Sequence, residues 1–268
     1  FGGCGFLGRY MTKELVSRGY KVRVFDRSVL YSEEGVEYIQ GDILDSNMVN
    51  SAISGSSIVY NLAAISDIEE CVQKPIQAIN YNITGNAIIM QACLDNNVER
   101  FVFSSSVYAY NDIGGIYSST KKASENFIKD FYKYYGLKYT ILQYGTIYGI
   151  GAPKENSMHK YLSCALFNKK IEYLGDGTEV REYIHVSDAS RLGVDILDQE
   201  YENKTLIITG HNPTNVKDLF RIIQEILRED IDVQYNAHSN IGRRKSHYKV
   251  TPYSVDKSLP CKLTSNLY

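Results

Sequence analysis

The 268-residue sequence lacks any apolar run close to the roughly 20 residues that a membrane-spanning helix requires. Hydrophobic residues make up 44% of the chain and charged residues 22%, which is typical of a globular protein. No basic segment followed by an apolar segment opens the chain, so no signal peptide is predicted. We therefore expect a soluble protein of the cytoplasm that makes no membrane contact.

The sequence also lacks an excess of charge of either sign. Its 29 basic and 31 acidic residues give a formal net charge of -2. Such a chain has no long-range attraction for nucleic acid, although a local cluster such as Arg243, Arg244 and Lys245 can still hold phosphate groups. We therefore expect no nucleic acid partner.

Cysteines are few and scattered. Their number is odd, and they show neither C-x-x-C spacing nor histidines at metal-ligand intervals. The five are Cys4, Cys71, Cys93, Cys164 and Cys261. This pattern predicts reduced thiols and no metal site.

The order of apolar residues predicts helices that alternate with strands. Leu7, Met11 and Leu15 recur at helical spacing, Gly19 supplies a stop, and residues 21–26 alternate as a strand. Further strands are predicted at 37–40, 57–62, 100–103, 138–142 and 205–209, and further helices at 161–167 and 216–227. This alternation favours an α/β fold of the Rossmann type with a doubly wound parallel sheet.

A glycine-rich turn opens the chain. Gly2, Gly5 and Gly8 allow a tight turn, close approach of the backbone to a pyrophosphate, and packing of the following helix. Almost nothing precedes this turn, so the first strand of the sheet is expected to be missing from the sequence. On these residues alone, an ordinary glycine-rich turn stays open as the alternative.

An acidic residue ends the next strand, which sharpens the prediction. Asp26 lies where a carboxylate accepts hydrogen bonds from the adenosine ribose hydroxyls and repels a 2′-phosphate, so NAD is favoured over NADP. The neighbouring Arg27 could instead accept a 2′-phosphate or stack on adenine. Asp42 follows the third strand near the adenine edge, and the small Ala63 and Ala64 leave room for the cofactor, although simple close packing explains them equally well.

A serine, a tyrosine and a lysine form the candidate catalytic group. Tyr117 and Lys121 are four residues apart and share a face if helical, and Ser106 closes the preceding strand. Oxidation of a secondary alcohol needs a base, and free tyrosine has a pKa near 10. The Lys121 ammonium and a positively charged nicotinamide would lower the pKa of Tyr117, and Ser106 would hold the substrate oxygen.

Tyrosine is common here, so a single Tyr-x-x-x-Lys pattern also arises by chance; the order of the five features favours the catalytic interpretation. Taken together, these features resemble the extended short-chain dehydrogenase/reductase family, in particular its nucleotide-sugar epimerases, dehydratases and dehydrogenases. The resemblance covers about residues 1–230. It rests on the segments at 2–8, 61–64, 82–85, 100–106, 117–121, 144–149 and 175–188.

The resemblance implies the following cofactor contacts for NAD: Gly2, Gly5, Phe6, Leu7, Gly8, Asp26, Arg27, Asp42, Ile43, Leu62, Ala63, Ala64, Tyr117, Lys121 and Tyr144. It also implies a nucleoside-diphosphate sugar as the substrate. The expected substrate contacts are Ser106, Thr146, Arg181 and Arg243 (or Arg244), with the arginines on the diphosphate.

The resemblance further implies two parts and a homodimer. Residues 1–145 and 178–210 would form the NAD-binding Rossmann domain, and residues 146–177 and 211–268 a smaller C-terminal substrate-binding region. The dimer would pair helices at about 77–96 and 118–135.

Three departures from the family pattern affect the lid and the choice of substrate. Asn111 follows Tyr110 where glycine is usual, the connection from Ser106 to Tyr117 is short, and Gln143 replaces a common arginine. In addition, residues 107–108 are Val-Tyr where 4,6-dehydratases carry Asp-Glu, which argues against water elimination.

The sequence therefore predicts NAD-dependent oxidation at C4 of a nucleoside-diphosphate hexose or heptose, by a 4-dehydrogenase or a 4-epimerase. No motif decides between release of the keto product and its reduction on the other face, and none selects the nucleotide. A reductase of a non-nucleotide ketone is one alternative, but it leaves Arg181 without a ligand. A non-catalytic dinucleotide-binding protein is the other, and the intact Ser106, Tyr117 and Lys121 argue against it.

Overall fold

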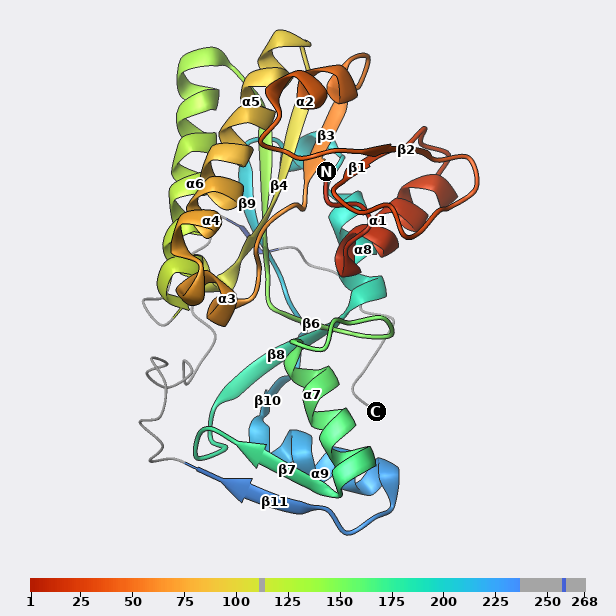
Figure 1. Cartoon of the computed structure of the whole chain (residues 1–268), viewed down its shortest axis with the longest axis vertical. Helices are drawn as coiled ribbons and strands as arrows, with labels where there is room; N and C mark the ends of the chain where they lie inside the picture. The colour runs from red at the N-terminus through yellow and green to blue at the C-terminus, as the bar shows by residue number, and fades with distance from the viewer. Residues whose placement is uncertain (111–113, 237–256, 259–268) are drawn as a thin grey trace.

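The structure is a computed structural model that describes residues 1–110, 114–236 and 257–258. A five-stranded sheet, in which every pair of neighbours is parallel, forms the centre of its larger part (Figure 1). In spatial order the strands are β12 (Lys257–Ser258), β9 (Lys204–Ile208), β5 (Tyr139–Tyr144), β4 (Arg100–Ser106) and β3 (Ile58–Asn61). The non-sequential order is the result of helical crossovers between parallel strands.

Helices cover both faces of this sheet, because successive strand residues point to opposite faces. Phe101 and Phe103 of β4 pack into a cluster with helices on one side, whereas Val102 between them packs into a cluster on the other. The helices of the first side are α2 (Ser46–Ile53), α5 (Gly85–Asp95) and α6 (Gly115–Tyr135); those of the second are α1 (Phe6–Ser17) and α8 (Val186–Asp195). The predicted doubly wound Rossmann-type fold is confirmed.

Two strands lie apart from the central sheet. β1 (Arg23–Asp26) and β2 (Glu37–Gln40) form their own parallel pair, and the first residues of the chain connect them to β3. The Phe1 amino group donates to Tyr60 O at 2.8 Å, and Gly2 N donates to Phe25 O at 2.9 Å. A cavity of about 800 Å³, lined by both edges, lies between the two sheets.

The smaller part holds two further sheets, drawn below the central sheet in Figure 1. One has the order β10 (Pro213–Asn215), β8 (Val180–His185) and β6 (Thr146–Tyr148), and the other pairs β11 (Asp232–Tyr235) with β7 (Lys170–Tyr173). α7 (Ser157–Ser163) and α9 (Val216–Leu227) complete this part. Its separate core is built around Phe220, Tyr173 and Met158.

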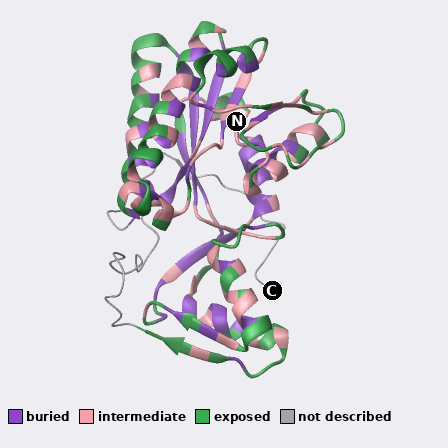
Figure 2. Ribbon diagram, viewed as in Figure 1, coloured by how far each residue is buried: buried purple, intermediate pink, exposed green. Residues whose placement is uncertain are grey.

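Short elements connect these units. They are α3 (Ile68–Gln73), α4 (Pro75–Ile79), π-helical turns at Asn80–Thr84 and Cys164–Asn168, and 3-10 turns at Val107–Tyr110 and Gln199–Tyr201. Figure 2 shows the buried strands of the central sheet between helices whose outer faces are exposed. No helix in the described ranges is both long and apolar enough to cross a bilayer.

Candidate active site

The glycine-rich turn lies between β1, β3 and the start of α1. Gly2 has a φ of +76°, and a Cβ built on it would lie 2.6 Å from the Ala63 nitrogen. A Cβ on Gly8 would overlap the Gly2 carbonyl oxygen. Gly5 precedes the helix as its N-cap, and no side chain caps the first turn of α1. The turn is therefore tight, and the N–H groups at this helix end are available to an anion.

A cavity of about 470 Å³ lies beside this turn. Eight of the residues predicted to contact the cofactor line it: Gly2, Gly5, Asp26, Arg27, Ile43, Leu62, Ala63 and Ala64. Arg9, Tyr31, Ile65 and Tyr81 also line it and were not predicted.

Asp26 is held rigidly at the edge of this cavity. One carboxylate oxygen accepts a hydrogen bond from Cys4 N at 3.0 Å, and the other accepts one from Ser28 N at 3.2 Å. Each oxygen has a further lone pair for a ribose hydroxyl. The position and charge of Asp26 fit NAD and disfavour a 2′-phosphate.

Arg27 and Asp42 both contact Tyr81, a residue that the sequence analysis missed. The Arg27 guanidinium lies 4.6 Å from the centre of the Tyr81 ring, and the Tyr81 hydroxyl donates to Asp42 at 2.9 Å. Arg27 thus stacks on an aromatic ring at the cavity wall. The only sequence signal was that Tyr81 directly precedes the 82–85 segment.

Arg9 is a second residue that the sequence analysis missed. Its Nη2 donates to Gly151 O at 3.1 Å, and its buried Nε has no hydrogen-bond partner among the described residues. A cationic side chain with an unsatisfied donor, one turn into α1 and lining the cavity, fits a pyrophosphate. Its position directly after Gly8 was the available signal.

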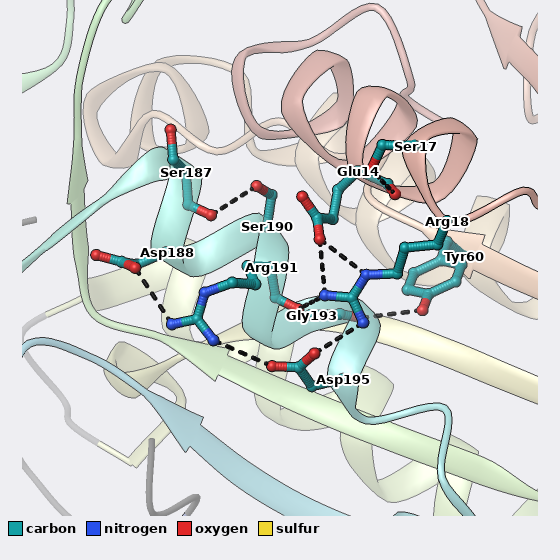
Figure 3. Close-up of polar contacts among 10 residues, drawn as sticks. All are labelled: Glu14, Ser17, Arg18, Tyr60, Ser187, Asp188, Ser190, Arg191, Gly193 and Asp195. Atoms are coloured by element: carbon teal, nitrogen blue, oxygen red, sulfur yellow. Dashed lines mark hydrogen bonds and ion pairs between the residues drawn. The ribbon is translucent and has the colours of Figure 1, made fainter. Parts of the chain in front are cut away.

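Ion pairs connect the C-terminal end of α1 to α8 (Figure 3). Arg18 pairs with Asp195 at 2.8 Å, and Arg191 bridges Asp195 and the fully buried Asp188, both at 3.3 Å. The Tyr60 hydroxyl at β3 donates to the Gly193 carbonyl at 2.9 Å. These contacts hold the C-terminal end of α1 against α8, and α8 against β3 of the central sheet.

The predicted catalytic residues lie together where β4 ends and α6 begins. Ser106 is the last residue of β4, and Tyr117 and Lys121 lie on the first two turns of α6. Their exposed fractions are 7%, 8% and 4%. Ser106 is close enough to Tyr117 to lower the pKa of its hydroxyl, and Lys121 Nζ lies 5.9 Å from the Tyr117 ring centre while donating to Ser104 O at 2.7 Å.

Burial dominates the electrostatics of this cluster. It raises the pKa of Tyr117 to about 12, opposed by the Ser106 hydrogen bond, and it lowers the pKa of Lys121 to about 8, opposed by the negative charge of Glu125. The lowered Tyr117 pKa expected from the sequence is therefore not produced by these protein groups. Burial disfavours both charged forms, and the Lys121 ammonium donates to a backbone carbonyl.

Asn82 connects the cavity to the catalytic helix. This buried side chain accepts from Ile65 N at 2.8 Å and donates to Ile65 O and to Thr120 Oγ1 of α6, each at 3.0 Å. Ile65 lines the cavity and belongs to the same apolar cluster as Tyr117. Asn82 and Ile65 therefore link the wall of the cavity to the helix that carries Tyr117 and Lys121.

Other predicted residues lie elsewhere. The Tyr144 side chain points into the core, where its hydroxyl lies 2.7 Å from the place of a Cβ on Gly193. The Phe6 ring packs edge-on against Tyr10, and Leu7 packs onto the core of the sheet. None of these side chains lines the cavity, because each faces an apolar neighbour.

The predicted substrate contacts are only partly described. Arg181 lies on β8 with 6% exposure and donates to Val180 O at 2.8 Å, and Thr146 begins β6 of the same sheet. Arg243 and Arg244 lie outside the described residues. In the described ranges no group of three His, Cys, Asp or Glu side chains is arranged to hold a metal ion.

Comparison with known families decides the membership of the chain. The model of the "NAD dependent epimerase/dehydratase family" matches residues 1–208. The chain belongs to this family. It is therefore an enzyme of the extended short-chain dehydrogenase/reductase type, and its cofactor is NAD.

Individual members of the family are similar over most of the chain. A UDP-glucose 4-epimerase of Lactobacillus helveticus is 32% identical over 223 residues, covering 70% of this chain and 67% of that protein. A UDP-N-acetyl-alpha-D-glucosaminuronate decarboxylase of Bacillus cytotoxicus is 26% identical, covering 84% and 78%. The fold matches that of a UDP-glucuronic acid 4-epimerase from Bacillus cereus, solved with a UDP-sugar analogue and NAD, with a TM-score of 0.87, 20% identity, and coverage of 99% and 93%.

Proposed function

We propose that this family member reversibly oxidises C4 of a UDP-sugar and acts as a UDP-sugar 4-epimerase. The observation that carries the proposal is the buried group of Ser106 at the end of β4 and Tyr117 on α6, with Lys121 one turn further along α6. The names of several relatives, among them the 4-epimerase at 32% identity, support the choice of UDP and of C4.

The cavity beside the glycine-rich turn would hold NAD. Asp26 would accept the adenosine ribose hydroxyls, and the N-terminus of α1 together with Arg9 would face the pyrophosphate. When bound, NAD would take up the hydride that leaves the sugar carbon.

The three catalytic side chains would act on the substrate hydroxyl. Tyr117 would remove the hydroxyl proton, and Ser106 would hold the same oxygen within reach of it. The Lys121 ammonium would stabilise the phenolate of Tyr117, whose pKa the buried site alone keeps raised. For Tyr117 to act as a base at neutral pH, its pKa must also be lowered by a second cation, which the positively charged nicotinamide of bound NAD would supply.

The residues after Ser106 support epimerisation over water elimination. Val107 is buried, and Tyr108 donates its backbone N–H to Ser106 Oγ at 3.2 Å. Neither side chain is an acid that could protonate a departing hydroxyl. Arg181 would bind the diphosphate, with Arg243 as a second contact; both assignments come from the family resemblance.

We also propose the two binding regions and the homodimer that the sequence analysis expects. Residues 1–145 and 178–210 would bind NAD, residues 146–177 and 211–268 would bind the sugar nucleotide, and two chains would pair through α5 and α6. Phe127 on α6 is 47% exposed, which suits a helix that is covered by a partner. Sedimentation measurements test the dimer.

Four free cysteines among the described residues agree with a cytoplasmic location.

A panel of substrates tests the proposed activity. Purified protein is incubated with NAD and UDP-, GDP-, dTDP- and CDP-sugars, products are analysed by mass spectrometry and NMR, and NADH absorbance is followed. We expect a UDP-sugar to return with unchanged mass and inverted C4. Net loss of two hydrogens with accumulation of NADH would identify a dehydrogenase instead, and no turnover of any UDP-sugar would contradict the proposal.

A further inference from the structure

A buried carboxylate lies one helical turn beyond Lys121. Glu125 is 2% exposed and belongs to α6, on the face that packs against the central sheet. No Lys, Arg or His nitrogen of a described residue lies within ion-pair distance of it. A buried charge without a cation in contact is costly, and the proposed chemistry assigns it no role.

Neutral donors surround this carboxylate instead. Gln143 Nε2 donates to both oxygens, at 2.9 and 3.1 Å, and the Tyr110 hydroxyl donates at 3.0 Å. Ser105 Oγ donates a further, short hydrogen bond. Ser105 and Gln143 are register partners on β4 and β5, so the sheet itself fixes both donors. Four donated hydrogen bonds suit an ionised carboxylate, which only accepts.

Three consecutive serines connect β4 to three side chains of α6. Ser104 accepts from Lys121 through its carbonyl, Ser105 donates to Glu125, and Ser106 lowers the pKa of Tyr117. The catalytic pair and Glu125 are thus held by one strand. Glu125 follows Lys121 by one helical turn, and its negative charge raises the pKa of Lys121 against the effect of burial.

We propose that Glu125 is a positioning residue whose buried charge keeps Lys121 protonated, and that Ser105 and Gln143 hold Glu125 for this purpose. The inference rests on the proposed role of Lys121 in catalysis. Gln143 is essential to it, because a cation at this position would neutralise Glu125. The neutral amide of Gln143 therefore leaves the field of Glu125 available to Lys121.

The other titratable groups near Lys121 are few. Tyr117 lies on the same helix, and Cys71 approaches from α3, with Asp67 and Glu70 close to the cysteine. Within the described residues, α4, α5 and the turn at 80–84 add no charge that acts on Lys121. Burial holds the pKa of Cys71 near 11, so this thiol stays neutral at pH 7. Glu125 is then the principal anion that opposes the burial of Lys121.

A titration of Lys121 by NMR tests the proposal without any substrate. The protein is prepared with ¹³Cε-lysine, and the Lys121 signal is assigned with Lys121→Arg. We expect the half-titration point, near pH 8 in the parent protein, to fall by roughly one pH unit in Glu125→Gln. Asp130→Asn, which removes an exposed charge from the same helix, is the matched control and should leave it unchanged.

Two more variants keep the test decisive if Glu125→Gln folds poorly. Gln143→Arg should lower the half-titration point of Lys121 by a similar amount, and Glu125→Asp should restore it toward the parent value. Where turnover is measurable, the alkaline limb of the plot of kcat against pH should move to lower pH in Gln143→Arg and should not move in Glu125→Asp. An unchanged Lys121 titration in both Glu125→Gln and Gln143→Arg would overturn the proposal. Because no substrate is used, that result is independent of the proposed activity.

Discussion

The cofactor cavity and the substrate-binding part are built from different stretches of chain. All residues that line the cavity come from positions 2–81, within successive strand and helix units. Apart from Ser106, the substrate contacts are instead proposed on β6 and β8 and beyond residue 236, so they come together only when distant segments pair. Because the cofactor site is built from one short stretch of the chain, it can be recognised from sequence motifs. The choice of sugar depends instead on contacts between segments that are far apart in the sequence.

The largest expected effect separates chemistry from cofactor binding. Tyr117→Phe should lower kcat by roughly 10²–10⁴-fold, because the base is removed, while the ring keeps its packing. The dissociation constant of NAD, measured by fluorescence titration, should stay the same because Tyr117 does not line the cavity. Full activity in the variant would remove Tyr117 from the mechanism.

A substitution in the glycine-rich turn should destabilise the locally built cofactor site. Gly2→Ala combines a positive φ with a backbone overlap at Ala63 and should lower the free energy of unfolding by roughly 3 kcal/mol. Gly19→Ala is the matched control: its φ is +83° and nothing lies within 4 Å of the added carbon, so a cost of about 1 kcal/mol is expected. Urea unfolding measures both, and equal costs would refute the close approach.

Replacement of Arg181 tests the proposed substrate-binding region. Arg181→Ala should weaken UDP binding by roughly 10- to 100-fold and leave NAD binding unchanged, because a charge-assisted contact to the diphosphate is lost. Calorimetric titrations with UDP and NAD measure the two affinities. Arg221→Ala on α9 removes an exposed arginine of the same part and should affect neither. Equal loss of both affinities in Arg181→Ala would indicate a structural role only.

The smallest expected effect concerns the choice between NAD and NADP. Asp26→Ala should narrow the preference for NAD by about tenfold, since the repulsion of a 2′-phosphate is lost. Parallel binding titrations with NAD and NADP give the ratio. Glu37→Ala removes an exposed carboxylate of the adjacent strand and should leave the ratio as it is. An unchanged ratio in Asp26→Ala would refute this assignment.

The sequence predicted the elements that short-range patterns define. The helix at 216–227 has the predicted bounds, and Tyr117 and Lys121 lie on a helix as their spacing required. It could not predict the short strands β6, β7 and β11, whose partners lie far away in the chain. Within the site it missed Arg9, because that role depends on Gly151, 142 residues later.

Tyr144 shows what a motif leaves open. The family resemblance predicts a cofactor contact for this residue, and its side chain faces Gly193 of α8 in the core. A motif specifies where the backbone runs, but the alternation of a strand decides to which side each side chain points. Residues at strand ends therefore need the structure before their contacts can be assigned.

The central claim is that the reaction begins by removing hydrogen from C4 of a UDP-sugar. The most direct measurement uses the UDP-sugar that turns over, with deuterium at C4, and follows both the rate and the fate of the label. The account predicts slower turnover and deuterium that is transferred to NADH or returned to C4 of the product, with no such effect from deuterium at C3 or C5. Loss of the C4 label to water, or turnover that leaves the C4 bond intact, would contradict it.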